Sequence, residues 1–327
     1  MPSARDLLDA AESRLAEAGV PSPRVDAELL LAHVTGRPRG LLRMSGTGLS
    51  EEQADRFRAL VEQRSARVPL QHLTGRAPFR HLELSVGPGV FIPRPETELV
   101  VDAVTAHLAV PDASVSGRSP LLVDLCSGSG ALAVALAVEV PRCRVHAVEV
   151  SDDAIGWLHR NVTEHGQAIE SAGSVVEVQH ADATRVVGPG GALAGLQGQV
   201  DVVVTNPPYV PDDAVPREPE VRDHDPALAL YGGPDGLDVV RLLARQAAQL
   251  LRPGGLLVVE HADVQGEAGG ESGVPSVLRA QRDHAGGSWT DVLDHLDLAG
   301  LPRFTTAVRT GAPGPQDAPP GRGRMSP

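Results

Sequence analysis

A short segment that contains two prolines, Thr205-Asn206-Pro207-Pro208-Tyr209, follows an apolar run and carries the clearest chemical signal in the chain. Consecutive prolines fix the backbone and offer carbonyl oxygens without competing N–H groups. The Asn206 side chain adds a second acceptor, so the segment can bind both hydrogens of an NH2 group while Tyr209 provides a flat wall. This arrangement suits methyl transfer to a planar, weakly nucleophilic nitrogen. The predicted catalytic and substrate-binding residues are therefore Asn206, Pro207, Pro208 and Tyr209.

A glycine-rich turn further upstream predicts a cofactor site. The residues Asp124-Leu-Cys-Ser-Gly-Ser-Gly130 lie between an apolar run and a helical pattern. Glycines let a ligand approach the backbone, and the start of a helix offers unpaired N–H groups. Residues 128–133 also satisfy the dinucleotide pattern G-x-G-x-x-A, and Glu149 stands 19 residues after Gly130, where an acid can hold ribose hydroxyls. From these residues alone, NAD and S-adenosylmethionine both fit.

A third polar position is Asp182, in the stretch His180-Ala-Asp-Ala183 that follows the next apolar run. An acid here can accept a hydrogen bond from an adenine amino group at the rim of a cofactor site. An exposed aspartate that only caps a turn is the alternative interpretation.

Strands that alternate with helices are expected to position these motifs. Apolar runs predict strands at 121–125, 144–150, 175–178, 200–204 and 256–259, and helical patterns cover 131–140, 153–165 and 237–251. This alternation predicts an α/β fold with a mostly parallel sheet. Two glycine-rich segments, 188–198 and 266–287, are expected to lack regular structure.

The first part of the chain has a different pattern. Apolar spacing predicts helices from Ala4 to about Arg67, and Ser50 has the signature of a helix cap. Alternating residues predict a hairpin over 79–93, and Pro95 and Thr97 open a further helix. The expected domains are a helical unit at 1–76, a hairpin and linking helix at 77–110, a catalytic domain at 111–310 and a disordered tail at 311–327.

Composition and charge narrow the classes of function. The 327 residues include 29 basic and 42 acidic side chains, which gives a formal net charge of −13. Residues 1–75 hold ten arginines and ten acids, so the remainder carries the whole net charge. A strongly acidic chain is a poor non-specific ligand for nucleic acid. Six acids between residues 212 and 225, directly after Tyr209, instead predict a surface that faces a basic protein partner.

The cysteines and histidines indicate the redox setting of the protein and whether it binds a metal. Cys126 and Cys143 are too few for a disulfide framework and predict a reducing, cytoplasmic setting. No apolar stretch approaches the length of a membrane span. The histidines and cysteines lack the spacing of metal ligands, so no metal is predicted.

The motifs together resemble those of class I S-adenosylmethionine methyltransferases that act on amino groups. Within that group, three more stretches are similar to the peptide chain release factor glutamine methyltransferases, namely Val68-Pro-Leu-Gln-His-Leu-Thr-Gly75, Phe91-Ile-Pro-Arg-Pro-Glu-Thr-Glu98 and Gly232-Gly-Pro-Asp-Gly-Leu-Asp238. The resemblance runs from about residue 4 to 310. It implies a Rossmann-like fold with a small N-terminal helical domain.

The resemblance also implies a reaction and its site. The expected substrate is the glutamine amide in the Gly-Gly-Gln motif of class I release factors. Apart from the resemblance, we expect a monomer, and the acidic charge predicts no direct contact with nucleic acid. Family positions that bind S-adenosylmethionine correspond to Asp124, Cys126, Ser127, Gly128, Ser129, Gly130, Glu149, Asp182, Ala183 and Asn206. Cys126 stands where such proteins often have glycine, which puts a left-handed backbone there in doubt.

Three other interpretations remain open from the sequence. A DNA adenine amino-methyltransferase uses the same N-P-P-Y chemistry, although the acidic charge counts against it. A non-enzymatic binding module is opposed by the intact N-P-P-Y segment. A dehydrogenase rests only on G-x-G-x-x-A.

Overall fold

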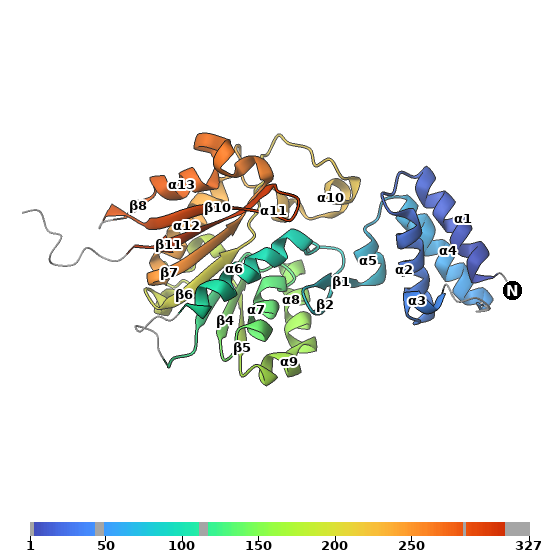
Figure 1. Ribbon diagram of the computed structural model, residues 1–327, viewed down its shortest axis with the longest axis horizontal. Helices are drawn as coiled ribbons and strands as arrows, with labels where there is room; N and C mark the ends of the chain where they lie inside the picture. The colour runs from blue at the N-terminus through green and yellow to red at the C-terminus, as the bar shows by residue number, and fades with distance from the viewer. Residues whose placement is uncertain (1–2, 43–48, 111–116, 284–285, 311–327) are drawn as a thin grey trace, which may run out of the picture. The chain divides into compact units, whose positions relative to one another are not determined.

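The computed structural model describes residues 3–42, 49–110, 117–283 and 286–310 of the chain. The chain divides into two compact units (Figure 1). The first unit is built from three stretches, Met1–Ala77, Glu83–Ile92 and Val215–Pro226, and the second unit from the rest. The third stretch of the first unit begins six residues after Tyr209, and the sequence did not indicate this arrangement.

Helices form most of the first unit, and the apolar spacing predicts those that lie before residue 67. They are α1 (Ala4–Glu17), α2 (Pro23–Thr35), α3 (Arg39–Leu42), α4 (Glu51–Ser65), α5 (Leu70–Thr74) and α10 (Pro219–His224). The capping box at Ser50 is confirmed, because its hydroxyl accepts the Gln53 N–H and the Gln53 side chain accepts the Ser50 N–H. Leu15, Leu30 and Phe57 are buried in the core between the helices, where burial of apolar surface stabilises the unit.

A buried ion-pair network ties α10 to α4 within the first unit. Arg64, on α4, pairs with Asp26 on α2 and with Glu220 on α10, both at 2.8 Å, and Arg67 pairs with Glu220 at 2.7 Å. Burial opposes ionisation of Glu220, but the hydrogen bonds from Arg67 and Arg64 outweigh it and lower its pKa to about 2. Glu220 therefore faces inward, which corrects the expectation that all six acids of 212–225 form one outward surface.

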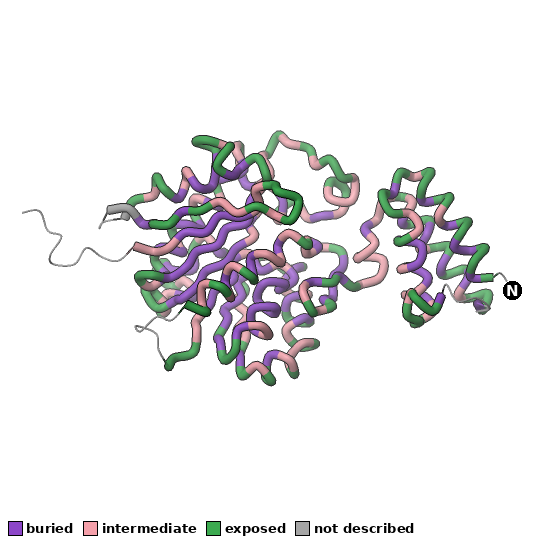
Figure 2. The backbone as a smooth tube through the Cα atoms, viewed as in Figure 1, coloured by how far each residue is buried: buried purple, intermediate pink, exposed green. Residues whose placement is uncertain are grey.

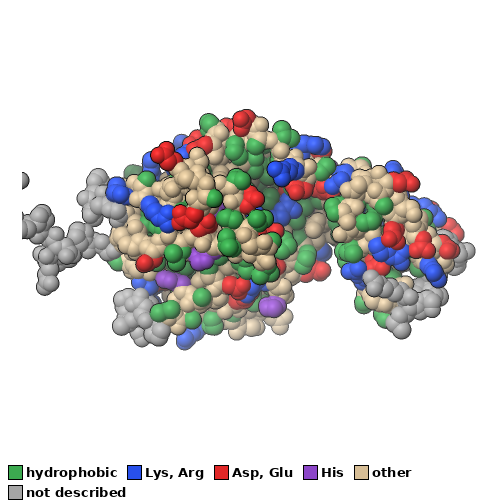
Figure 3. All heavy atoms as spheres, turned by 45° about the horizontal axis from the view of Figure 1, so that its top comes forward, with side chains coloured by type: hydrophobic (Ala, Val, Ile, Leu, Met, Phe, Trp, Pro, Cys, Tyr) green, Lys and Arg blue, Asp and Glu red, His purple; other side chains and the backbone are tan. Residues whose placement is uncertain are grey.

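Charges of both signs cover the helices of the first unit. Arg and acidic side chains lie beside each other on the face drawn at the right of Figure 3. Several are paired, as Arg14 is with Glu62 at 3.0 Å and Arg39 with Glu28 at 2.6 Å. No single-sign basic face of the kind that binds a phosphate backbone is visible there.

A seven-stranded sheet forms the second unit, in the order β10-β11-β7-β6-β3-β4-β5. Its strands are β3 (Leu121–Leu125), β4 (Arg144–Glu149), β5 (Val175–His180), β6 (Val200–Thr205), β7 (Leu251–Glu260), β10 (Trp289–Leu296) and β11 (Pro302–Arg309). Strands β3 to β7 run parallel to one another, and β11 and β10 extend the sheet beyond β7 in antiparallel pairing. The predicted mostly parallel, Rossmann-like sheet is confirmed.

Helices cover both faces of this sheet (Figure 1). One group is α6 (Glu98–Ala109), preceded by the 3-10 turn η1 (Pro95–Thr97), with α7 (Ala131–Glu139), α8 (Asp152–Glu164) and α9 (Gly166–Ser171). The other face carries α12 (Asp238–Leu250) and α13 (Val274–Ala280). Because both faces are covered, the central strands are buried along their length (Figure 2). The connection after β6 also contains α11 (Ala227–Leu230).

Three local predictions are wrong. The hairpin pairs β1 (Arg76–Phe79) with β2 (Leu82–Ser85), so it lies earlier than the predicted 79–93. The segment 266–287 contains α13, which buries Val274 and Leu278, as well as the short pair β8 (Arg282–Asp283) and β9 (Gly286–Gly287). The glycine-rich 188–198 includes the 3-10 turn η4 (Ala194–Leu196) and buries Leu193. The tail expected at 311–327 lies outside the described residues.

Candidate active site

The ends of four neighbouring strands bring the predicted motifs together in the second unit. Hydrogen bonds join the turns that follow these strands: Ser127 N–H to Val148 at 2.9 Å, Ala181 N–H to Glu149 at 2.9 Å, and the Thr205 hydroxyl to Leu125 at 2.7 Å. The glycine-rich turn after β3 is thus flanked by the end of β4 and by the N-P-P-Y segment after β6. This edge of a parallel sheet is where α/β proteins bind ligands.

Asp124 fixes the glycine-rich turn from inside. Its Oδ2 accepts the N–H of Ala133 in the first turn of α7, at 3.1 Å, and the Ser127 hydroxyl donates to the Asp124 carbonyl. Burial raises the pKa of Asp124 to about 7. Gly130 has φ +84° and caps α7, and a Cβ there would collide with the Leu158 side chain. Asp124 and Gly130 therefore shape the turn from positions that are themselves buried.

Cys126 adopts the left-handed backbone that its side chain disfavours. Its φ is +63°, so the doubt raised by the missing glycine is resolved in favour of a left-handed turn. Burial, together with the charges of Glu149 and Asp124, raises the pKa of the Cys126 thiol well above its ordinary value. The group is therefore a neutral thiol rather than a nucleophile.

Glu149 lies at the end of β4 with its carboxylate held by backbone amides. Oε2 accepts the Gly128 N–H at 2.8 Å, and Oε1 accepts the N–H groups of Val150 and Ser151 at 2.9 and 2.8 Å. A carboxylate has about four acceptor sites, so it retains capacity for a hydroxyl donor. The arrangement fixes an acceptor beside the open backbone of Gly128, where a Cβ would meet no other atom within 4 Å.

Asp182 and Ala183 follow β5 and have unequal surroundings. Asp182 is exposed and caps the 3-10 turn η3 (Ala183–Arg185), where its Oδ1 accepts both the N–H and the hydroxyl of Thr184. Ala183 is buried in the main apolar cluster. The alternative interpretation of Asp182 as a turn cap therefore describes part of its role, and Oδ2 stays toward solvent with Arg185 at 3.7 Å.

The N-P-P-Y segment begins where β6 ends. Asn206 is half-buried, and its Nδ2 donates to the Thr97 hydroxyl at 3.4 Å. Among the described residues, neither Asn206 Oδ1 nor the Pro207 carbonyl accepts a hydrogen bond, so both are available as acceptors. Burial, aided by the charge of Glu260, raises the pKa of Tyr209, which keeps its phenol neutral.

A second loop packs closely behind this segment, and the sequence predicts no structural role for it. Gly232 and Gly236 pass so near the carbonyls of Pro208 and Tyr209 that a Cβ at either glycine would overlap them. Gln265, in the 3-10 turn η5 (Asp263–Gln265), donates to the Tyr209 carbonyl at 3.0 Å. The motif Gly232–Asp238 was the available signal, because glycines at fixed spacing indicate close backbone approach. A further 3-10 stretch, η6 (Glu267–Ser272), follows η5.

Comparison with known proteins gives this geometry a family. Residues 6–75 match the model of the PrmC N-terminal domain, and residues 100–218 match the methyltransferase small domain. Three curated relatives are named release factor glutamine methyltransferase. The protein of Streptomyces coelicolor is 50% identical over 91% of this chain and 95% of its own length. Those of Mycolicibacterium smegmatis and Mycobacterium tuberculosis H37Rv are 45% and 43% identical, each over 94% of this chain and over 99% and 92% of their own lengths. The chain belongs to the release factor glutamine methyltransferase family.

Family membership makes the chain a methyltransferase whose cofactor is S-adenosylmethionine. The residues present fit that group. The fixed Glu149 carboxylate suits ribose hydroxyls, and the glycine turn exposes backbone beside it. A dehydrogenase built on the same glycine pattern is thereby excluded as the interpretation of this turn.

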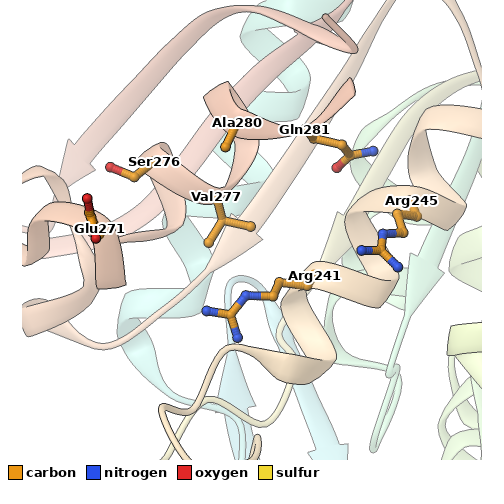
Figure 4. Close-up of a pocket in the computed structure, with 7 residues that line it drawn as sticks. All are labelled: Arg241, Arg245, Glu271, Ser276, Val277, Ala280 and Gln281. Carbon is orange, nitrogen blue, oxygen red and sulfur yellow. The ribbon is translucent and has the colours of Figure 1, made fainter. Parts of the chain in front are cut away.

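Other candidate features of this methyltransferase lie elsewhere. A pocket of about 450 Å³ lies between α12 and α13, and its lining includes Arg241, Val277 and Gln281 (Figure 4). No predicted site residue lines it, and the Arg241 guanidinium is engaged by Asp235. In the described part of the chain, no cluster of three or more His, Cys, Asp or Glu side chains could hold a metal ion. The helices described there are all too short or too polar to cross a bilayer.

Proposed function

We propose that this chain methylates the side-chain amide nitrogen of the glutamine in the Gly-Gly-Gln motif of class I peptide chain release factors. The observation that carries the proposal is the pair of unfilled acceptors, Asn206 Oδ1 and the Pro207 carbonyl, at the end of β6 beside the cofactor turn. The names of the curated relatives support the same substrate class.

The two acceptors match the chemistry of a primary amide. An amide nitrogen is a weak nucleophile because its lone pair is delocalised into the carbonyl. Asn206 Oδ1 and the Pro207 carbonyl would each accept one N–H, which aims the lone pair at the methyl group, and Tyr209 would pack on the amide plane. Both acceptors also stabilise positive charge that develops on the nitrogen. Positioning of this kind can contribute about 7–11 kcal/mol to lowering the barrier.

The cofactor residues are proposed from the geometry at the strand ends. S-adenosylmethionine supplies an electrophilic methyl group on a sulfonium centre. Glu149 would hold the ribose, Asp182 and Ala183 would contact the adenine end, and Asp124 keeps the turn in shape. The remaining contacts are assigned to Cys126, Ser127, Gly128, Ser129, Gly130 and Asn206. A strong general base is not required, because a methylated, protonated amide is very acidic.

The parts of the chain are assigned accordingly. We assign residues 1–76 to substrate recognition, 77–110 to a hairpin and linking helix, and 111–310 to the cofactor and catalysis. The enzyme is expected to act as a monomer in the cytoplasm, on a protein rather than on nucleic acid. The two free cysteines and the net charge of −13 support this setting.

Methyl transfer from labelled S-adenosylmethionine tests the proposal. Purified class I release factor and duplex DNA are offered separately, and mass spectrometry locates the added methyl group. Label on the Gly-Gly-Gln glutamine is the expected result. Label on DNA adenine alone would instead assign the chain to DNA amino-methyltransferases.

We call the two acceptors, Asn206 Oδ1 and the Pro207 carbonyl, the amide clamp. Removal of one acceptor tests it. Asn206→Ala should lower kcat by about 100-fold or more, as loss of one positioned group does in other sites. Gln199→Ala serves as the matched control, because it removes an exposed amide at the other end of the β6 strand. Equal rates for the wild type and Asn206→Ala would rule out the clamp.

A further inference from the structure

A buried carboxyl group lies behind Asn206, and none of the predicted motifs includes it. Glu260 ends β7, the strand next to β6, and the register pairs Thr205 with Val259. Its side chain is 1% exposed, and in the described part of the chain its Oε2 has no hydrogen-bond partner. Burial of a carboxylate with an unfilled acceptor is costly. A role at the neighbouring site would account for that cost.

One hydroxyl connects Glu260 with Asn206. Thr97, at the end of η1, is buried, and its hydroxyl lies close enough to the Glu260 carboxyl to lower the pKa of that group as a hydrogen-bond donor. The same hydroxyl accepts the Asn206 Nδ2–H at 3.4 Å. Three side chains from three different elements thus form a continuous chain that leads to the amide clamp.

The direction of each hydrogen bond in the series Glu260–Thr97–Asn206 follows from which groups can donate and which can accept. An ionised carboxylate can only accept hydrogen bonds, and a threonine hydroxyl has a single proton to donate. Thr97 therefore donates to Glu260, and its oxygen is left to accept. Only the NH2 end of the Asn206 amide can face that oxygen, so Oδ1 must point the other way.

We propose that Glu260 is a positioning residue that acts through Thr97 to fix which end of the Asn206 amide faces the substrate. The inference rests on the proposed function, because the substrate amide needs an acceptor from Asn206. Without the carboxylate, Thr97 can turn its proton toward Asn206, and the Asn206 amide can flip. The NH2 end would then meet the NH2 of the substrate, two groups that both donate.

The charges around Glu260 come from three neighbouring segments. Arg94 and Glu96 approach from the stretch before α6 and Arg303 from β11. The neutral phenol of Tyr209, in the N-P-P-Y segment, is the third neighbour. Burial raises the pKa of Glu260 to about 7, although the Thr97 hydrogen bond opposes the shift. The carboxylate that orients Asn206 therefore forms as pH rises through about 7, and kcat should rise over the same range.

Steady-state kinetics with labelled S-adenosylmethionine and release factor test this role. Glu260→Gln and Thr97→Val, both close in shape to the native residues, should each lower kcat tenfold or more. KM for both substrates should stay within twofold, and the rise of kcat near pH 7 should be absent in Glu260→Gln. Thr97→Ser keeps the hydroxyl and should keep most of the rate. The double variant should be no slower than the slower single variant, because both changes break one chain.

A control and a second readout separate positioning from folding. Thr305→Val removes an equally buried hydroxyl from the strand β11, where it bonds to His261 at 2.9 Å, and should leave kcat unchanged. The side-chain amide signals of Asn206 in ¹⁵N NMR should shift in Glu260→Gln and not in Thr305→Val. This second readout needs no methyl transfer.

Either readout can overturn the inference. A kcat for Glu260→Gln within twofold of wild type, or strictly additive losses in the double variant, would contradict the positioning role. Unchanged Asn206 signals would do so independently. Failure of the proposed function gives a different result, because the wild type itself would then leave release factor unlabelled. The NMR comparison would still decide the orientation of the Asn206 side-chain amide.

Discussion

At the scale of single residues, Cys126 carries backbone strain in the middle of the cofactor turn. A non-glycine residue at φ +63° costs about 1–2 kcal/mol relative to glycine. Cys126→Gly relieves that strain but gives the unfolded chain more freedom, which costs about 0.5–1 kcal/mol. We expect a net gain of up to about 1 kcal/mol in unfolding free energy, measured by urea denaturation.

A matched variant isolates the backbone effect from the loss of the thiol. Cys126→Ala removes the sulfur and keeps Cβ, so it should gain no stability. If Cys126→Ala and Cys126→Gly are equally stable, the left-handed conformation is not the source of strain. The neutral thiol also predicts that alkylating reagents modify the residue slowly, because the thiolate is the reactive form.

The sequence predicts the placement of single residues where they belong to a short motif. Asn206, Glu149 and the glycine turn lie together as the patterns predict, and each follows a strand. Thr97 and Glu260 were missed as site residues because their meaning depends on distant segments. Thr97 is 109 positions from Asn206 in sequence, and only the folded sheet joins them.

At the scale of elements, α10 is attached to the first unit by charge more than by apolar contact. None of its residues is buried, whereas Arg64 beneath it is 5% exposed and pairs with Glu220. Loss of one partner from such a pair typically costs about 3–5 kcal/mol, because the other charge stays buried. Glu220→Gln should therefore loosen α10 and expose its amides to hydrogen exchange.

The pH dependence of this attachment has a definite sign. The pKa of Glu220 is about 2 in the folded protein and 4.5 ordinarily, so its stabilising effect is complete above pH 4.5 and is lost as pH falls through about 2. Exchange rates of α10 in wild type and Glu220→Gln should differ most above pH 4.5 and converge toward pH 2. Glu218→Gln, an exposed neighbour, should match the wild type throughout.

Elements were predicted well where one physical signal dominates. The apolar runs predict the bounds of β3, β4 and β6 to within a residue, and the periodic spacing predicts a helical region that contains α1, α2 and α4. Strand β10, with the sequence Trp-Thr-Asp-Val-Leu-Asp-His-Leu, lies at the sheet edge, where one side meets solvent, and its polar residues concealed it. Helix α13 was hidden by glycines on both sides, although Val274 and Leu278 pack into the core.

At the scale of the whole molecule, only some of the acids in the segment 212–225 are placed where a basic partner can reach them. Of the six acids between 212 and 225, Glu220 is paired inward, Asp223 is bridged by Arg222, and Asp225 is buried. Asp212, Asp213 and Glu218 remain exposed after the N-P-P-Y segment. These three are the acids that can meet a basic partner.

Neutralising the three exposed acids tests their role in association. Asp212→Asn/Asp213→Asn/Glu218→Gln should lower the association rate with release factor and flatten its dependence on salt, with kcat unchanged. Stopped-flow measurements at several salt concentrations give both quantities. The triple variant Glu83→Gln/Glu170→Gln/Glu271→Gln removes equal charge from exposed positions elsewhere and serves as the control. Identical salt slopes in the two triple variants would show that only net charge matters.

The path of the chain limits how this protein can be recombined with its relatives. Because Val215–Pro226 completes the first unit from within the methyltransferase part of the sequence, the helices are not a cassette that ends at residue 77. A gene fusion made at that point would transfer Arg64 and Arg67 while leaving Glu220 behind. Exchange between family members should therefore succeed only when both stretches travel together, and the two should be inherited as one block.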